Sequence, residues 1–145
     1  MAGRLISAII GLGLLGGAQA ATAQGQSLDA QYAAYHPNDG AIVGARSAAF
    51  RSCIDRSGGV TVALRACSHD EYERLDAQLN RNYRQLMSRI GRSHQQALRA
   101  SQRRWLRNRW QSCEHRPEYE GGTMDLIIRD GCILDELTRR TLWLE

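Results

Sequence analysis

The chain has 145 residues, of which 43% are hydrophobic and 23% are charged. That length allows one domain and excludes a multidomain architecture. Its 19 basic residues, all of them arginine, outnumber the 15 acidic ones and give a formal net charge of +4 at pH 7. A basic chain favours anionic partners, so nucleic acid, envelope polymer and protein partners all have to be weighed.

Residues 1–20 are expected to be a secretory signal peptide. Arg4 supplies a short positive region, residues 5–15 are largely apolar, and Ala18-Gln19-Ala20 fits the small-x-small cleavage rule. A second fit at Ala21-Thr22-Ala23 leaves the cleavage position open. The apolar stretch is shorter than the roughly 20 residues that span a bilayer, so a membrane anchor is the weaker interpretation. We expect a periplasmic or secreted protein with no transmembrane segment after signal removal.

Residues 21–40 are rich in Ala, Gln, Gly, Ser and Asp, and are expected to form a flexible leader with no fold of its own. From residue 41 the apolar residues recur at steps of three and four, which is typical of helices. No strand-like alternation and no internal repeat is present. The sequence therefore predicts a small all-α domain over residues 41–145.

Four helical blocks are expected within this domain. A short one begins near Asp39, carries Cys53 and ends at Ser57-Gly58-Gly59, and a long one follows over residues 60–90. A third block, capped by Ser93, is expected to reach residue 113. The last block covers residues 123–144, with Thr123 as its cap and a break at Asp130-Gly131, and it is expected to return and cover the two helices before it.

The two longest blocks are expected to form a long antiparallel helix hairpin that turns at Gly91. Pairing across this turn places Leu79 opposite Trp105 and brings Asp76 level with Arg109. Because a buried charge survives only when it is paired and hydrogen-bonded, we predict an Asp76–Arg109 ion pair with amide groups bonded nearby. The predicted structural network consists of Asp76, Asn80, Tyr83, Gln102, Trp105 and Arg109.

Four cysteines in a small exported chain indicate two disulfides, and they permit three pairings. Pairing of Cys53 with Cys67 and of Cys113 with Cys132 is favoured, because each needs only a helix–loop–helix return. Cys67 with Cys113 is the main rival, since both lie at the open end of the predicted hairpin.

A set of residues spread from Cys53 to Leu144 matches a known family in order and spacing. The set comprises Cys53, Cys67, Leu79-Asn80, Tyr83, Gln102, Trp105, Arg109, Cys113, Gly121-Gly122-Thr123, Cys132, Leu137-Thr138 and Arg140. Through them the chain resembles the lysozyme inhibitor LprI-type N-terminal domain. The resemblance implies a helical exported protein, and the family is named for members that bind and inhibit lysozyme. The chain departs from the family at Trp110, where an acid often follows the arginine.

No catalytic or metal-binding group is expected. The four histidines, at positions 36, 69, 94 and 115, fall in different segments, and nothing singles out a serine or carboxylate dyad. Cys67-Ser68-His69 and Cys113-Glu114-His115 each place a histidine two residues after a cysteine. Zinc sites usually show tighter paired spacing, so the disulfide interpretation is favoured. We expect no enzyme activity, no metal and no cofactor, with a hydrolase as the least favoured class.

Residues 81–116 hold ten arginines and one acid, Glu114, interleaved with Trp105 and Trp110. Such a segment suits a phosphate backbone with stacked bases. Export argues against a nucleic-acid partner, and none is expected. Loose attachment to an anionic envelope polymer is the better use of such a surface.

The function expected from the resemblance is that of an envelope binding protein similar to a lysozyme inhibitor, acting by non-covalent binding. Its partner would be a lysozyme or another envelope protein. An acidic projection would suit a basic lysozyme. The candidate partner-binding residues are Asp70, Glu71, Glu114, Glu118, Tyr119 and Glu120. The alternative is an envelope-associated structural or stress module that binds anionic polymer or another protein without inhibiting lysozyme.

Overall fold

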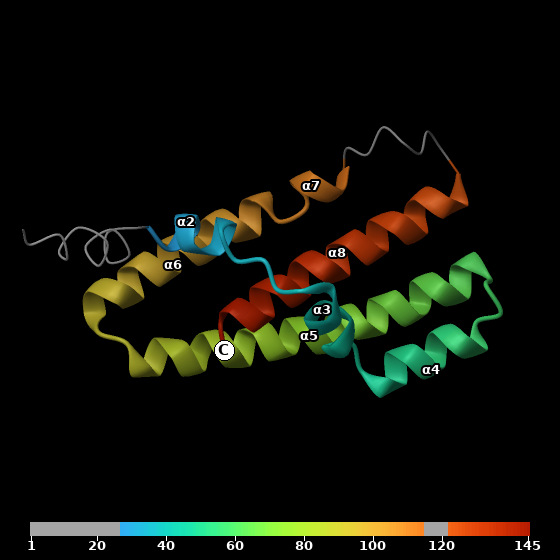
Figure 1. Cartoon of the computed structure of the whole chain (residues 1–145), viewed down its shortest axis with the longest axis horizontal. Helices are drawn as coiled ribbons and strands as arrows, with labels where there is room; N and C mark the ends of the chain where they lie inside the picture. The colour runs from blue at the N-terminus through green and yellow to red at the C-terminus, as the bar shows by residue number, and fades with distance from the viewer. Residues whose placement is uncertain (1–26, 115–121) are drawn as a thin grey trace, which may run out of the picture.

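The protein is seen here in a computed structural model that describes residues 27–114 and 122–145. Within these residues the chain forms helices and no strands, as the sequence predicts. The predicted signal peptide lies outside the described residues. Figure 1 shows the helices in chain order: α2 (Leu28–Ala33), α3 (Asp39–Gly44), α4 (Ala48–Arg56), α5 (Thr61–Arg89), α6 (Arg92–Asn108), α7 (Gln111–Glu114) and α8 (Thr123–Trp143).

The long helix α5 is amphipathic, and its buried residues lie four apart: Cys67, Glu71, Leu75 and Leu79. This spacing keeps one stripe of the helix facing inward over four turns. The helix ends where Ile90 takes an extended conformation, and the chain turns at Gly91 into α6. Gly91, not the predicted Ser93, occupies the N-cap position of α6.

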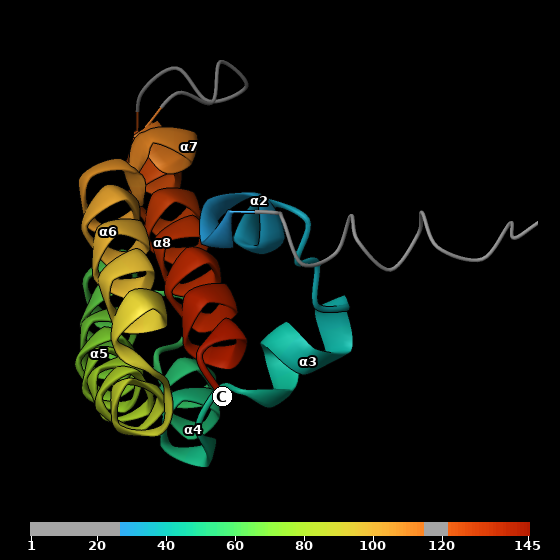
Figure 2. The same ribbon diagram turned by 90° about the vertical axis from the view of Figure 1, so that its left-hand side faces the viewer.

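Helix α8 lies against both α5 and α6. It runs between them in the view of Figure 1, and the turned view of Figure 2 shows the three helices as a bundle. The Asn82 side-chain amide on α5 donates to the Thr141 carbonyl of α8 over 3.1 Å. The closest helix packing is between α5 and α8. The hairpin of α5 and α6 is therefore an open one with α8 between its helices, whereas the sequence predicted a closed hairpin that the last helix covers.

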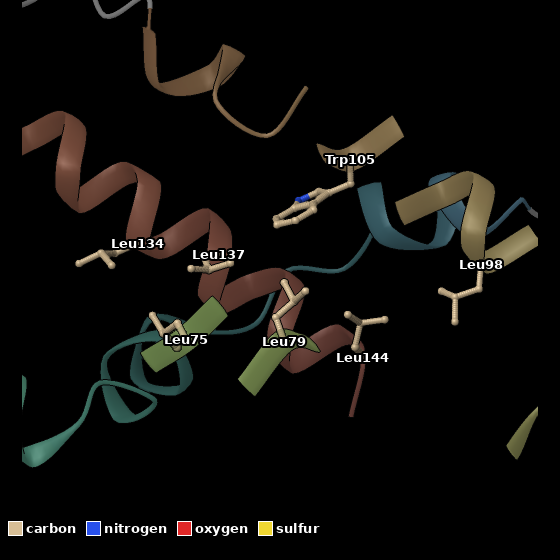
Figure 3. Packing of buried hydrophobic residues seen from close by; sticks show 7 residues of the cluster. All are labelled: Leu75, Leu79, Leu98, Trp105, Leu134, Leu137 and Leu144. Atoms are coloured by element: carbon tan, nitrogen blue, oxygen red, sulfur yellow. The ribbon is translucent and has the colours of Figure 1, made fainter. Parts of the chain in front are cut away.

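The core is shared by these three helices. Figure 3 shows Leu75 and Leu79 of α5, Leu98 and Trp105 of α6, and Leu134, Leu137 and Leu144 of α8. Leu79 and Trp105 belong to the same cluster, but the leucines of α8 complete it. Helix α8 is continuous through the predicted break at Asp130-Gly131. Its N-cap is Gly122, and Thr123 is the first helical residue and not the cap.

Part of the segment predicted as a flexible leader is helical, since α2 lies within it and is capped by the side chain of Ser27. The single short helix predicted from Asp39 is instead two helices, α3 and α4, whose N-caps are Asn38 and Ser47. Helix α2 contacts the core through Tyr32, whose hydroxyl donates to Glu136 of α8 over 2.8 Å. The folded domain therefore begins upstream of residue 41.

The two disulfides are the local pairs that the sequence favoured. Cys53–Cys67 ties α4 to α5, and Cys113–Cys132 ties α7 to α8, each with a Cα–Cα distance of 5.7 Å. The rival Cys67–Cys113 pair does not form. In the part of the chain that the structure describes, no helix is both long and apolar enough to cross a membrane.

Candidate functional site

The predicted ion pair between Asp76 and Arg109 is wrong. Among the described residues, the Asp76 carboxylate instead accepts a hydrogen bond of 2.9 Å from the Asn80 amide on its own helix. Arg109 lies just past the end of α6, with its guanidinium 4.4 Å from the Trp110 ring centroid and 5.7 Å from that of Trp105. The prediction failed because α8, and not α5, supplies the polar partner of α6.

Arg140 on α8 is a fully buried charge. Its Nε donates to the Gln102 side-chain oxygen over 3.0 Å, and its Nη2 donates to the Ser101 hydroxyl over 3.2 Å. Gln102 and Trp105 are thus buried network residues, as predicted, but their partner is Arg140. Tyr83 is half-buried against the core.

In the sequence, Arg140 stands out only as one of the residues that carry the family resemblance. A signal for its burial was available, because Arg140 lies three residues after Leu137 and four before Leu144. That spacing places it on the buried stripe of α8.

Aromatic rings surround the Arg140 guanidinium in place of a carboxylate. Its central carbon lies 4.4 Å from the ring centroid of Trp143, 4.7 Å from that of Tyr32 and 5.7 Å from that of Trp105. Burial lowers the pKa of Arg140 to about 10, although nearby Tyr32, Asp29 and Glu136 act in the opposite direction. Arg140 remains a cation at neutral pH, held by ring faces and neutral acceptors.

Helix α2 covers this region. Tyr32 makes an edge contact with Trp143, with ring centroids 5.6 Å apart. Burial, and then the adjacent Glu136 carboxylate, raise the pKa of the Tyr32 hydroxyl above its usual range, so Tyr32 stays a neutral donor. An ion pair between Asp29 and Arg104 holds the other side of α2 against α6.

A cavity of about 420 Å³ lies where α2, α6 and α8 meet. We call it the α2 cavity. Its walls include four arginines and two acids: Arg104, Arg109, Arg139, Arg140, Asp29 and Glu136. Three buried N–H groups of its lining residues have no hydrogen-bond partner in the described part of the chain: Trp105 Nε1, Arg109 Nε and Arg140 Nη1.

The predicted partner-binding residues differ in their exposure and in whether the structure describes them. Asp70 on α5 and Glu114 on α7 are exposed, with α8 between the two helices (Figure 1). Glu118, Tyr119 and Glu120 lie outside the described residues.

Glu71 is a structural residue and not a free surface acid, which corrects the prediction. Its side chain is 2% exposed and accepts hydrogen bonds from the Ser47 backbone amide at 2.9 Å and the Ser47 hydroxyl at 2.7 Å. Arg74 adds an ion pair at 2.7 Å. Burial alone would raise the pKa of Glu71, but the hydrogen bonds from Arg74 and Ser47 lower it overall.

In the described part of the chain, no group of three His, Cys, Asp or Glu side chains is arranged to hold a metal ion. All four cysteines are in disulfides and so offer no thiolate ligand.

The fold and the site define a disulfide-linked, all-helical domain with a buried arginine at the junction of its N-terminal and C-terminal helices. The chain belongs to the family described as lysozyme inhibitor LprI, whose sequence profile matches residues 53–144. This range includes both disulfides and Arg140, and it confirms the resemblance drawn from the sequence. No curated protein and no solved structure matches the chain.

Proposed function

We propose that the protein is an exported binding protein that inhibits a lysozyme by non-covalent association and has no catalytic activity of its own. The observation that supports this proposal is membership of the lysozyme inhibitor LprI family over residues 53–144. The two disulfides support a location in an oxidising compartment, which for this chain means the periplasm or the exterior.

The charge distribution along α5 favours one end of the molecule for lysozyme contact. Residues 61–80 hold four acids and two arginines, whereas residues 81–109 hold nine arginines and no acid. Animal lysozymes are basic proteins, so opposite charges favour an approach to the first half of α5 and disfavour an approach to the turn between α5 and α6.

Among the described residues, we propose Asp70 and Glu114 as contact residues. Both are exposed acids, the first on the first half of α5 and the second on α7, away from the turn between α5 and α6. Glu73 is exposed on the same part of α5 and adds to the negative charge there. Glu118, Tyr119 and Glu120 remain candidate contacts from the sequence. Glu71 is no longer a candidate, since its carboxylate is buried and fully engaged.

The test is a titration of the oxidised protein into a c-type lysozyme that is lysing a peptidoglycan-bearing cell suspension. We expect saturable loss of lysis near one-to-one stoichiometry. Asp70→Arg should weaken inhibition about tenfold or more, because it replaces an attraction with a like-charge contact.

Asp39→Arg is the matched control, since Asp39 is an exposed acid on α3 and undergoes the same change of charge. It should inhibit nearly as well as the native chain. Absence of inhibition at large molar excess would exclude c-type lysozyme as the partner. Equal weakening by both variants would show that net charge, and not the proposed end of α5, controls binding.

A second candidate function is attachment to an anionic envelope polymer. The observation that favours it is a group of exposed arginines on α5 and α6 that make no ion pair within the described residues. We call this group the basic surface; it consists of Arg81, Arg84, Arg89, Arg92, Arg99, Arg103 and Arg107. Salt-sensitive adsorption without lysozyme inhibition would favour this second function.

A further inference from the structure

The arginines that line the α2 cavity are unequally neutralised. Arg104 is paired with Asp29, and Arg139 is paired with Glu136. Arg109 and Arg140 have no carboxylate partner in the described part of the chain. Both guanidinium carbons lie 5.7 Å from the ring centroid of Trp105, so two arginines without an ion pair lie near one indole.

Hydrogen bonding at this place is also incomplete. Buried N–H groups in native proteins nearly always have an acceptor, and leaving one without a partner is costly. Here three such donors belong to residues that line one cavity, on Trp105, Arg109 and Arg140. Because all three are donors, a ligand bound here would have to supply acceptors.

We propose that the α2 cavity binds a small organic acid through its carboxylate. A carboxylate offers acceptors for the three N–H groups and also a negative charge for the two unpaired arginines, whereas water offers only the acceptors. A volume of about 420 Å³ falls within the range of small-molecule sites. Tyr32 and Trp105 add aromatic walls for the remainder of the ligand. This inference does not depend on lysozyme inhibition.

The three donor atoms have almost no exposed surface, so a neighbouring element must shift before a ligand can accept from them. Helix α2 suits such a movement, because none of its six residues is fully buried. Its attachments include the Tyr32–Glu136 hydrogen bond and the Asp29–Arg104 ion pair, and the latter joins two partly exposed side chains. Exposed ion pairs contribute little to stability and open readily.

The experiment is an NMR titration of the oxidised, ¹⁵N-labelled protein. The probes are acetate, N-acetylmuramic acid, N-acetylglucosamine and inorganic phosphate. N-acetylmuramic acid carries a carboxylate that N-acetylglucosamine lacks, so the two form a matched pair. We expect the two carboxylates to shift the indole Nε1–H signal of Trp105 and the Nε–H signal of Arg109 saturably. N-acetylglucosamine should leave both signals unchanged.

Two variants then separate a built site from general attraction of anions. Arg109→Gln removes one unpaired cation of the cavity, and Arg107→Gln removes an exposed charge two residues away that does not line it. We expect Arg109→Gln to weaken carboxylate binding about tenfold or more and Arg107→Gln to change it less than about twofold. The NMR signals of the native chain provide the test even if Arg109→Gln fails to fold.

Three results would overturn the proposal. The first is the absence of a saturable shift at Trp105 and Arg109 with either carboxylate, including the case in which phosphate alone binds. The second is an equal response to N-acetylglucosamine. The third is equal weakening by Arg109→Gln and Arg107→Gln, which would show that the overall positive charge attracts the anion.

Discussion

Arg140 shows how a buried cation is held without an ion pair. Its neighbours are neutral acceptors on Gln102 and Ser101 and the faces of aromatic rings. Removing one member of a buried ion pair is costly because it leaves the other charge unpaired. Arg140 has no ion-pair partner to leave behind, and the nearby Asp29 and Glu136 keep their own ion pairs with Arg104 and Arg139, so the loss should be smaller.

We expect Arg140→Met to lower the free energy of unfolding by about 1–3 kcal/mol, since it leaves the buried Gln102 oxygen without its donor. The double variant Arg140→Met with Gln102→Leu should recover part of that loss, because both polar partners are then replaced by apolar groups. Urea denaturation of the native chain, both single variants and the double variant gives the coupling energy. Strictly additive losses would contradict the argument that Gln102 is present to satisfy Arg140.

Glu71 performs the corresponding role with a negative charge. It accepts hydrogen bonds from Ser47, the N-cap residue of α4, and is paired with Arg74, whose Nη2 donates to the Ala45 carbonyl over 2.8 Å. One carboxylate thereby fixes the corner between α3 and α4 against α5.

The stability contributed by Glu71 should depend on pH. Since the pKa of Glu71 is lowered in the folded state, its contribution is present above the unfolded pKa of about 4.3 and is lost as the pH falls through the folded value. Glu71→Gln should lower the free energy of unfolding by about 1–3 kcal/mol at pH 7, and the difference from the native chain should shrink below about pH 4.

The control is Glu73→Gln, since Glu73 is an exposed acid on the same helix. It should change the free energy of unfolding by less than about 0.5 kcal/mol. Urea denaturation at pH 7 and at low pH measures both, and a pH-independent loss for Glu71→Gln would refute the argument.

At the scale of elements, the long helices could be predicted, but α2 was missed and the break between α3 and α4 was not foreseen. The apolar period of α5 and α8 extends over many turns, so it dominates any local exception such as Gly131. Helix α2 has six residues and no buried residue, so no apolar stripe identifies it, and its N-cap Ser27 by itself also fits a turn. The apolar residues from Ile42 to Cys53 predicted one helix, because they continue at helical spacing across the break before Ser47.

The position of α8 was predicted incompletely, since the last helix was expected to cover the hairpin and instead lies between α5 and α6. Pairing residues across the turn at Gly91 treated α5 and α6 as each other's main partners, and this assigned Arg109 to Asp76. In the structure α8 contributes three of the core leucines and the buried Arg140. Sequence spacing identified the buried stripes and favoured the disulfide pairs that form, but it could not determine which stripe faces which.

At the scale of the whole molecule, charge is distributed unevenly between residues 61–80, with four acids and two arginines, and residues 81–109, with nine arginines and no acid. The basic surface lies on α6 and the second half of α5, and the exposed acids Asp70, Glu73 and Glu114 lie on the first half of α5 and on α7 (Figure 1). A basic lysozyme and an anionic polymer would therefore be drawn to different ends of one chain. The two candidate functions consequently differ in which charges they need.

This separation predicts that polymer attachment and lysozyme inhibition can be changed independently. The triple variant Arg81→Gln, Arg84→Gln and Arg89→Gln removes three charges of the basic surface. It should elute from immobilised polygalacturonate at clearly lower salt than the native chain, because fewer cations then contact the polymer. Its inhibition of lysozyme should not fall, since these residues lie away from Asp70 and Glu114.

A second triple variant at Arg51, Arg56 and Arg129, which are also exposed, removes the same total charge and should shift elution much less. Equal shifts for the two triples would show that net charge alone governs adsorption, and loss of inhibition in the first triple would show that the basic surface contacts lysozyme.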